Sequence, residues 1–157
     1  MTIREKVIKA VNDYVGKNGF NTWMSRKEVQ EYVNSCYEEK IASGSLLPTD
    51  YCYNRYNSGL ANFAEKDRLF EYNDGQFRLL GEHYSYTGDV WHYPSDKTVK
   101  PYVVGRWENG TFTHYTNFEI EEIKEEDRFR EEAPIIANNI DDEFDSQGLE
   151  GEERIVA

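Results

Sequence analysis

The strongest constraint on the fold is a hairpin signal at residues 69–80, which read LFEYNDGQFRLL. Two runs rich in apolar and aromatic residues flank Asn-Asp-Gly, and these three residue types tolerate the positive φ angles of a tight hairpin turn. A second signal lies at residues 101–115, where Glu-Asn-Gly separates PYVVGRW from TFTHY. The sequence therefore predicts two antiparallel hairpins.

Two helices are predicted before the first hairpin. Thr2 with Glu5, and Ser25 with Glu28, have the hydroxyl-to-carboxylate spacing of a capping box. Apolar residues follow each box at helical spacing, so we expect one helix that ends at Gly19 and a second that ends near Ser43–Gly44. The short run at residues 21–24 could pair as a small strand between them.

The segment PTDYCYNRYNSG, residues 48–59, is the most unusual part of the chain. Pro48 precedes two residues that can cap a helix, and Asn-Ser-Gly closes the segment. We predict a short third helix from Tyr51 to Tyr56.

Three helices followed by a two-stranded hairpin resemble the winged helix-turn-helix class over residues 1–82. The expected fold is α+β, with a winged-helix-like core at 1–82 and an appended hairpin at 83–118. An acidic helix and tail would occupy residues 119–157. We expect the appended hairpin to pack on the core through Trp91, Tyr102 and Trp107. The segment PTDYCYNRYNSG also resembles uncharacterised bacterial and phage domains, some of which lie beside nuclease or restriction-type modules.

In DNA-binding winged helices the third helix enters the major groove and the wing touches the backbone. The resemblance therefore implies that the following residues contact nucleic acid, the first four at bases and the last two at phosphates: Tyr51, Asn54, Arg55, Asn57, Arg68 and Arg78. The alternative is packing, in which Tyr53 and another tyrosine fill the core, Asn57 caps the helix, and Arg55 pairs with a surface carboxylate.

The net charge of −12 is unevenly distributed. Residues 1–118 carry 14 Lys and Arg against 15 Asp and Glu, whereas residues 119–157 carry 4 against 15. The first part is close to neutral and can present a local basic face. The acidic part could imitate nucleic acid and bind a basic partner protein, or it could be a solvated tail. The residues expected to bind such a partner are Glu121, Glu122, Glu125, Glu126, Asp141 and Asp142.

Other chemistry is less supported by the sequence. His83, His92 and His114 lack the short spacing of a metal site. Asp96 with Glu122 and Lys124 matches a loose metal-dependent nuclease pattern, which is common by chance in charged helices. Cys36 lies on an apolar helix face, and Cys52 could be either packed or an exposed reactive thiol. We expect no cofactor and no metal.

We therefore predict a non-enzymatic nucleic-acid-binding protein, bacterial or phage, with an acidic regulatory tail. The alternative is an acidic inhibitor or adaptor that binds a basic protein. The chain shows no signal peptide and no membrane-spanning run, so we expect a soluble cytoplasmic protein. The sequence leaves the oligomeric state open.

Overall fold

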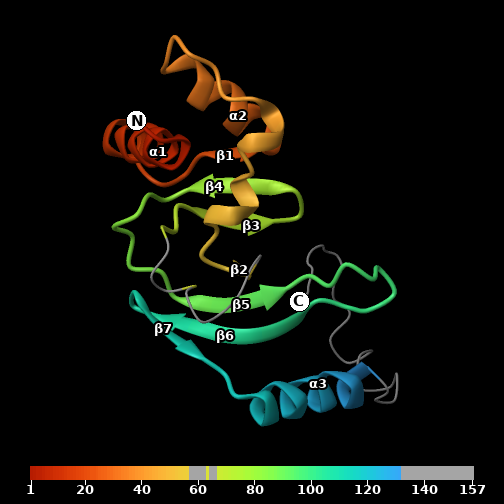
Figure 1. Cartoon of the computed structure of the whole chain (residues 1–157). Coiled ribbons are helices and arrows are strands. Elements are labelled where there is room, and N and C mark those ends of the chain that lie inside the picture. Colours follow the sequence, from red (N-terminus) through yellow and green to blue (C-terminus); the bar gives the residue numbers. More distant parts are fainter. Residues whose placement is uncertain (57–62, 64–66, 132–157) are drawn as a thin grey trace, which may run out of the picture. The chain divides into compact units, whose positions relative to one another are not determined.

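The structure, a computed structural model, describes residues 1–56, 63 and 67–131. It is a mixed α+β fold with two β-sheets (Figure 1). The helical elements are α1 (Ile3–Asn18), α2 (Arg26–Ser35), the 3-10 turns η1 (Ser43–Ser45) and η2 (Pro48–Tyr51), and α3 (Asn117–Glu131). The strands are β1 (Trp23–Ser25), β2 (Arg55–Tyr56), β3 (Phe70–Asn73), β4 (Gln76–Leu79), β5 (Gly88–His92), β6 (Tyr102–Glu108) and β7 (Thr111–His114).

Both capping boxes are present. The hydroxyl of Thr2 accepts from the amide of Glu5, and the Glu5 carboxylate accepts from the amide of Thr2. Ser25 and Glu28 repeat this arrangement at α2. Each box satisfies amides that the first turn of a helix leaves without a partner. The predicted starts of both helices are thus confirmed.

The predicted end of the second helix was wrong, because α2 stops at Ser35. The side chain of Asn34 donates to the carbonyl of Ile41 and accepts from its amide. Lys40 donates to the carbonyl of Asn34, near the end of the helix, and to that of Tyr37, just beyond it. These bonds fold the chain back and bring Ile41 into the core, where it is buried. A continuing helix would have carried Ile41 away from that core.

The first sheet has the strand order β1-β4-β3, with β4 antiparallel to both neighbours. Asp74 and Gly75 have φ angles of 49° and 82°, which confirms the hairpin turn expected from Asn-Asp-Gly. The short strand expected near residues 21–24 is β1. Its residues pair with β4, so the strand between the two helices forms one edge of the sheet.

The second sheet has the order β2-β5-β6-β7. Strands β6 and β7 form the second expected hairpin, with Asn109 and Gly110 at positive φ in the turn. The sequence did not reveal β5, which pairs antiparallel with β6 through an irregular register at Val90 and Trp91. In the appended hairpin, β6 is therefore an inner strand of the sheet and β7 is an edge strand. Strand β5 connects the hairpin to β2, which lies much earlier in the chain.

The predicted third helix at residues 51–56 was wrong. Helical hydrogen bonding ends with the 3-10 turn η2 at Tyr51, and the chain then extends to form β2. Cys52 pairs with Phe70 as a parallel bridge, and the amide of Tyr53 donates to the Phe70 carbonyl at 2.8 Å. Two residues later, Arg55 and Tyr56 pair in parallel with Trp91 and His92. Tertiary pairing on both sides overrides the weak local preference for helix.

We call residues 51–56 the bridging segment, because its backbone serves both sheets. Figure 1 shows β2 between β3 of the first sheet and β5 of the second. The amide of Leu69 donates to the carbonyl of Tyr51, while the amide of Trp91 donates to the carbonyl of Asn54. The segment thus places the second sheet beside the edge of the first.

Each sheet has its own apolar core. The first core joins α1, α2 and the first sheet, with Val7, Val33 and Leu79 fully buried. The second surrounds Tyr53 and Trp107. The indole Nε1 of Trp107 donates to the carbonyl of Tyr53 at 2.8 Å, and the Tyr53 hydroxyl donates to the carbonyl of Gly81 at 2.6 Å. Trp107 therefore makes the expected contact with the core, and Trp91 and Tyr102 are only partly buried.

The chain divides into two compact units, residues 1–120 and 121–157. Helix α3 begins in the first unit, where Ile120 is buried in the second core, and continues into the other unit. Within the described residues, no helix has the length and apolar character needed to cross a membrane.

The hydroxyl of Tyr53 offers a first test of the junction between the sheets. We expect Tyr53→Phe to lower the free energy of unfolding by about 1–2 kcal/mol, because it leaves the buried carbonyl of Gly81 without its donor. Urea denaturation measures this loss. Tyr115→Phe is the matched control, since the Tyr115 ring packs on the same core and its hydroxyl has no hydrogen-bond partner in the described part of the chain. Equal losses in the two variants would contradict the role given to the Tyr53 hydroxyl.

Candidate functional site

Two of the predicted contact residues act mainly within the fold. Tyr51 is half-buried against the first core, and its carbonyl accepts from Leu69. The side chain of Asn54 accepts from the amide of Tyr72 at 2.8 Å and donates to the carbonyl of Tyr72 at 2.9 Å. Asn54 thereby pairs with β3 as a backbone unit would. The amide atoms of Asn54 that would bond to a base are already hydrogen-bonded to Tyr72.

The two arginines assigned to phosphates are also engaged. Arg68 is 7% exposed, donates to the carbonyl of Cys52 and lies over the ring of Phe63. Burial lowers the pKa of its guanidinium. Arg78 makes bonds of 2.9 Å and 2.8 Å to Oε1 of Glu71, and it also donates to the carbonyl of Phe20.

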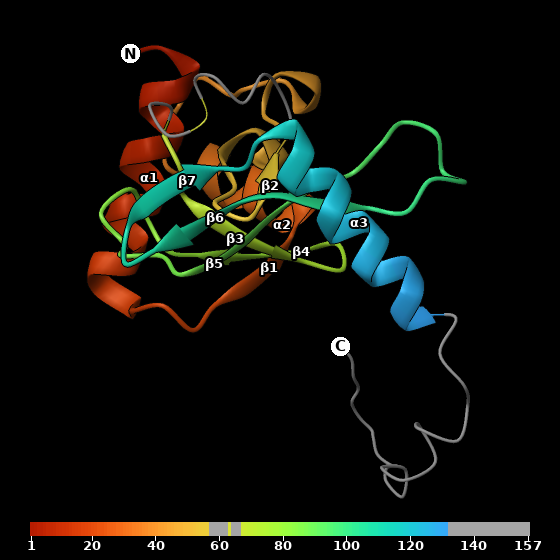
Figure 2. The same ribbon diagram turned by 90° about the horizontal axis from the view of Figure 1, so that it is seen from below.

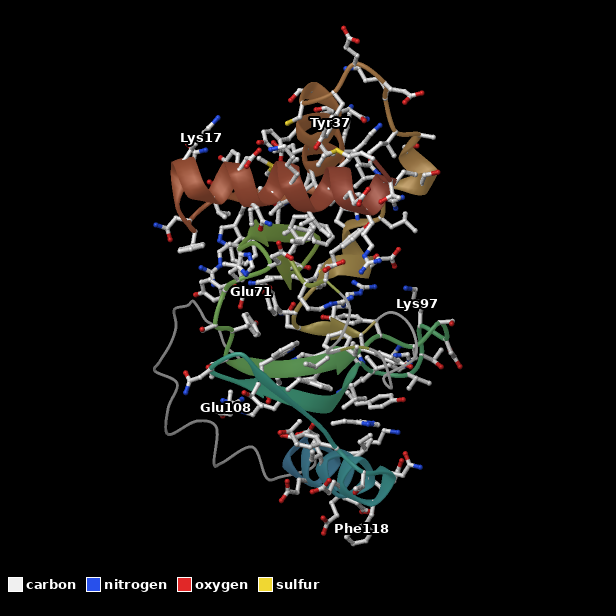
Figure 3. All side chains as sticks on the ribbon, turned by 60° about the vertical axis from the view of Figure 1, so that its left-hand side comes forward. Lys17, Tyr37, Glu71, Lys97, Glu108 and Phe118 are labelled. Carbon is white, nitrogen blue, oxygen red and sulfur yellow. The ribbon has the colours of Figure 1, made fainter. Side chains whose placement is uncertain are left out.

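Glu71 joins this ion pair to the second core. Its other carboxylate oxygen, Oε2, accepts from the hydroxyl of Tyr86 at 2.8 Å. Burial, and then the bond to Glu71, raise the pKa of Tyr86 well above its ordinary value. Figure 3 shows Glu71 among the side chains of the first sheet. The charge of Arg78 is therefore neutralised within the fold.

Arg55 differs from the other arginines that are at least partly buried. Its guanidinium carbon lies 4.6 Å from the ring centroid of Tyr72 and 4.2 Å from that of Tyr93. The two rings meet edge to face at 5.6 Å. In the described part of the chain, no carboxylate pairs with this guanidinium, and its buried Nε meets no hydrogen-bond acceptor. The pairing with a surface carboxylate that the packing alternative assigned to Arg55 is thus absent from these residues.

The position of Arg55 follows from the two sheets. Tyr72 belongs to β3 of the first sheet, whereas Tyr93 directly follows β5 of the second. The bridging segment places Arg55 between them by pairing it with Trp91. A cation between two aromatic faces is stabilised by about 0.5–2 kcal/mol, with the higher value when it is desolvated. The site is therefore a positive charge held rigidly where the two sheets meet.

An aromatic cluster lies on the other face of β2, because neighbouring residues of a strand point to opposite faces. The imidazole of His92 lies 5.1 Å from the Tyr56 ring and 5.3 Å from the Tyr102 ring. Its register partners are these same two residues. His92 and Tyr56 therefore pack against each other on the side away from Arg55.

Tyr93 opens the long loop between β5 and β6, which projects beyond the strands (Figures 1 and 2). The loop contains a turn in which the amide of Val99 donates to the carbonyl of Asp96. The amide and hydroxyl of Thr98 both donate to the Asp96 carboxylate and hold the pKa of Asp96 below its ordinary value. This turn presents Lys97, which Figure 3 shows on the projecting loop.

The sequence did not predict Tyr72 or Tyr93 as site residues. Tyr93 precedes Pro94, and a residue before proline is biased towards an extended conformation. That signal indicates its backbone but not its contact with Arg55. Tyr72 was predicted only as a hairpin residue. Its role depends on the bridging segment, which local patterns did not reveal.

The acidic residues expected to bind a partner are described only in part. Glu121, Glu122, Glu125 and Glu126 are exposed on α3. Asn57, Asp141 and Asp142 lie outside the described residues. Lys124 lies 3.3 Å from the carboxylate of Glu121.

The residues of the loose nuclease pattern are divided between the two compact units. Asp96 bonds to Thr98 within its loop, and Glu122 and Lys124 belong to the other compact unit. Among the residues that the structure describes, no three His, Cys, Asp or Glu side chains gather to hold a metal ion. Of the histidines, His83 is exposed near Glu82, and His114 is exposed on β7.

Residues 2–114 match the family model of a domain of unknown function, DUF7225. The chain belongs to this family. The match ends before α3, so the acidic helix and tail lie beyond the part that the family model covers. The chain is also 36% identical over 111 residues to "Uncharacterized protein YnaC" of Bacillus subtilis (strain 168).

The alignment with YnaC covers 70% of this chain and 38% of that relative. The chain thus spans well under half of the relative's length. No solved structure matches the chain.

The two cysteines provide a test of the bridging segment. Cys52 is fully buried, and burial raises the pKa of its thiol to about 12, whereas Cys36 is exposed. At pH 8 the Cys52 thiol is therefore protonated as well as inaccessible. We expect Ellman's reagent to titrate one thiol in the folded protein and both in urea. Cys36→Ser should abolish the native reaction and Cys52→Ala should leave it. Rapid native reaction of the Cys36→Ser variant would contradict the buried bridging segment.

Proposed function

We propose that this chain is a non-enzymatic, cytoplasmic nucleic-acid-binding protein whose principal contact is Arg55. The observation that carries the proposal is the guanidinium between Tyr72 and Tyr93, which pairs with no carboxylate among residues 1–56, 63 and 67–131. A partly buried cation attracts anions more strongly than a fully solvated one, because solvent screens it less. Arginine also presents several N–H donors in a geometry that suits phosphate oxygens.

Three other arginines support this assignment by contrast. Arg106 contacts Asp89 at 3.0 Å and Glu108 at 2.7 Å, Arg78 is paired with Glu71, and Arg68 bonds to a backbone carbonyl. Each of these cations stabilises the fold through an acceptor from this chain. Arg55 is positioned by aromatic rings instead, which fix its geometry and leave its positive charge for a ligand.

We further propose that residues 1–82 are a variant of the winged-helix class. The chain runs α1, β1, α2 and then β3 and β4, with β4 between β1 and β3. This arrangement is compatible with two helices followed by a wing. The turns η1 and η2 lead into residues 51–56, where a third helix was expected and where the chain instead extends to form β2. Nucleic acid would then be bound at the junction of the sheets and not by a helix in the major groove.

The acidic residues 119–157 have a regulatory role in this proposal. They carry 15 carboxylates in a chain whose first 118 residues are nearly neutral. A tethered anionic segment competes with nucleic acid for a cationic site, because its effective concentration near that site is high. The segment would thus restrain binding at low nucleic-acid concentration.

Removal of the charge of Arg55 tests the proposal. We expect Arg55→Met to weaken binding of a fluorescein-labelled DNA oligonucleotide at least tenfold at low salt, and to reduce the salt slope of log K by about one. Methionine keeps an apolar side chain between Tyr72 and Tyr93, so the fold should persist. Fluorescence anisotropy at several salt concentrations measures both effects.

Arg106→Met is the matched control, because its charge is already paired with Asp89 and Glu108. Its affinity for the oligonucleotide should stay within about twofold of the unmodified protein, as is usual when a screened surface pair is lost. Equal affinities of the Arg55→Met variant and the unmodified protein would refute the proposal.

A second candidate function is supported by the exposed carboxylates of α3. Glu121 with Glu125, and Glu122 with Glu126, each stand four residues apart, so their side chains form neighbouring like-charged pairs on the helix. Such pairs destabilise an isolated helix by about 0.2–0.5 kcal/mol each. A basic partner protein would relieve this repulsion. The chain would then be an acidic inhibitor or adaptor.

An oligolysine peptide is a suitable probe for this second function. We expect Glu122→Gln with Glu126→Gln to weaken peptide binding several-fold at low salt, by reducing the local negative potential. The control is Glu38→Gln with Glu39→Gln, which removes two exposed carboxylates outside α3. If both double variants lose affinity equally, binding reflects only the net charge, and α3 is not a docking element.

A further inference from the structure

Tyr93, which is partly exposed, extends the site beyond Arg55. Its ring receives the guanidinium on one face at 4.2 Å, and the Tyr72 ring meets it edge to face. Tyr93 nevertheless remains 36% exposed. Burial raises the pKa of its phenol, so the ring stays neutral at physiological pH and does not repel an anion.

Single strands and duplexes make different demands on such a site. Arg55 is partly buried, so a phosphate has to approach the point where two tyrosine rings converge. A duplex is a stiff rod with a persistence length of about 150 base pairs, and its base faces are covered by stacking. A single strand bends readily and exposes the faces of its bases, which can stack on aromatic side chains.

We propose that the ligand of Arg55 is a single-stranded nucleic acid, with a phosphate on the guanidinium and an unpaired base stacked on the ring of Tyr93. This inference rests on the proposed function and specifies its substrate class. Arg55 supplies charge, Tyr93 supplies a stacking surface, and Lys97 on the same loop adds a second positive charge for the backbone. The cation and the base on the ring of Tyr93 would both contribute to binding.

The test compares three labelled probes of about twelve units each, a length within the usual range for single-strand sites. They are oligothymidine, an abasic oligomer with the same phosphates, and a duplex. The full chain should bind oligothymidine roughly tenfold or more tighter than the abasic oligomer, because base stacking contributes only to the former. The duplex should bind more weakly than oligothymidine at equal salt.

Variants of Tyr93 separate stacking from charge. Tyr93→Ala should reduce the ratio of oligothymidine affinity to abasic affinity to about one, whereas Tyr93→Phe should keep the ratio because it retains the ring. The ratio is the appropriate readout because loss of Tyr93 also loosens Arg55, and that effect weakens both probes alike.

The outcomes distinguish this inference from the proposed function. If all three probes bind with equal affinity and binding depends on Arg55, base stacking is refuted and nucleic-acid binding stands. If the duplex binds tightest, the single-strand assignment is refuted. If no probe binds the full chain at low salt, both proposals fail.

Discussion

The two sheets depend on how the backbone of residues 51–56 divides its hydrogen bonds. The first half of this bridging segment bonds to Leu69 and Phe70 of the first sheet, and the second half pairs with Trp91 and His92 of the second. A helix over these residues would satisfy its own amides and carbonyls and leave both sheet edges unpaired. Because unpaired backbone groups are costly when buried, the extended form is strongly favoured. The tyrosines of PTDYCYNRYNSG then serve different purposes according to the sheet that each one faces.

The same constraint creates the candidate site. Tyr72 and Tyr93 come from different sheets, so they can enclose Arg55 only after the bridging segment has joined those sheets. Asn54 fixes the segment against β3 through both atoms of its amide group. Arg55, the next residue, is thereby held in place without a carboxylate from the described part of the chain. The charge is available to a ligand because aromatic rings perform the positioning that an acidic residue performs for Arg78 and Arg106. The site lies within residues 2–114, which the family model matches, whereas the acidic helix lies beyond them.

Local signals predicted the parts of the fold that local physics determines. Capping boxes at Thr2 and Ser25 and positive-φ turn residues at Asp74 and Asn109 act over a few residues, and the structure has them as expected. The prediction of a third helix was wrong because residues 51–56 pair with β3 and β5. These strands lie some fifteen to forty residues further along the chain, beyond the reach of local patterns. Of the three residues of the candidate site, the sequence predicted only Arg55, which was chosen for its charge. It did not predict Tyr72 or Tyr93 as site residues. Asn54 and Arg68 have the residue types of a nucleic-acid contact, and only their hydrogen bonds show that the fold already uses them.

Native-state hydrogen exchange tests most directly whether the bridging segment joins the sheets into one cooperative unit. The amides to follow are those of Tyr53 and Leu80 at the first sheet and that of Trp91 at the second, all of which donate to backbone carbonyls. If the sheets depend on the segment, the three amides exchange through the same opening reaction, with equal free energies and the same dependence on urea. If Trp91 exchanges at much lower free energy while Leu80 stays protected, the second sheet opens independently, and Arg55 is not held rigidly between two fixed rings.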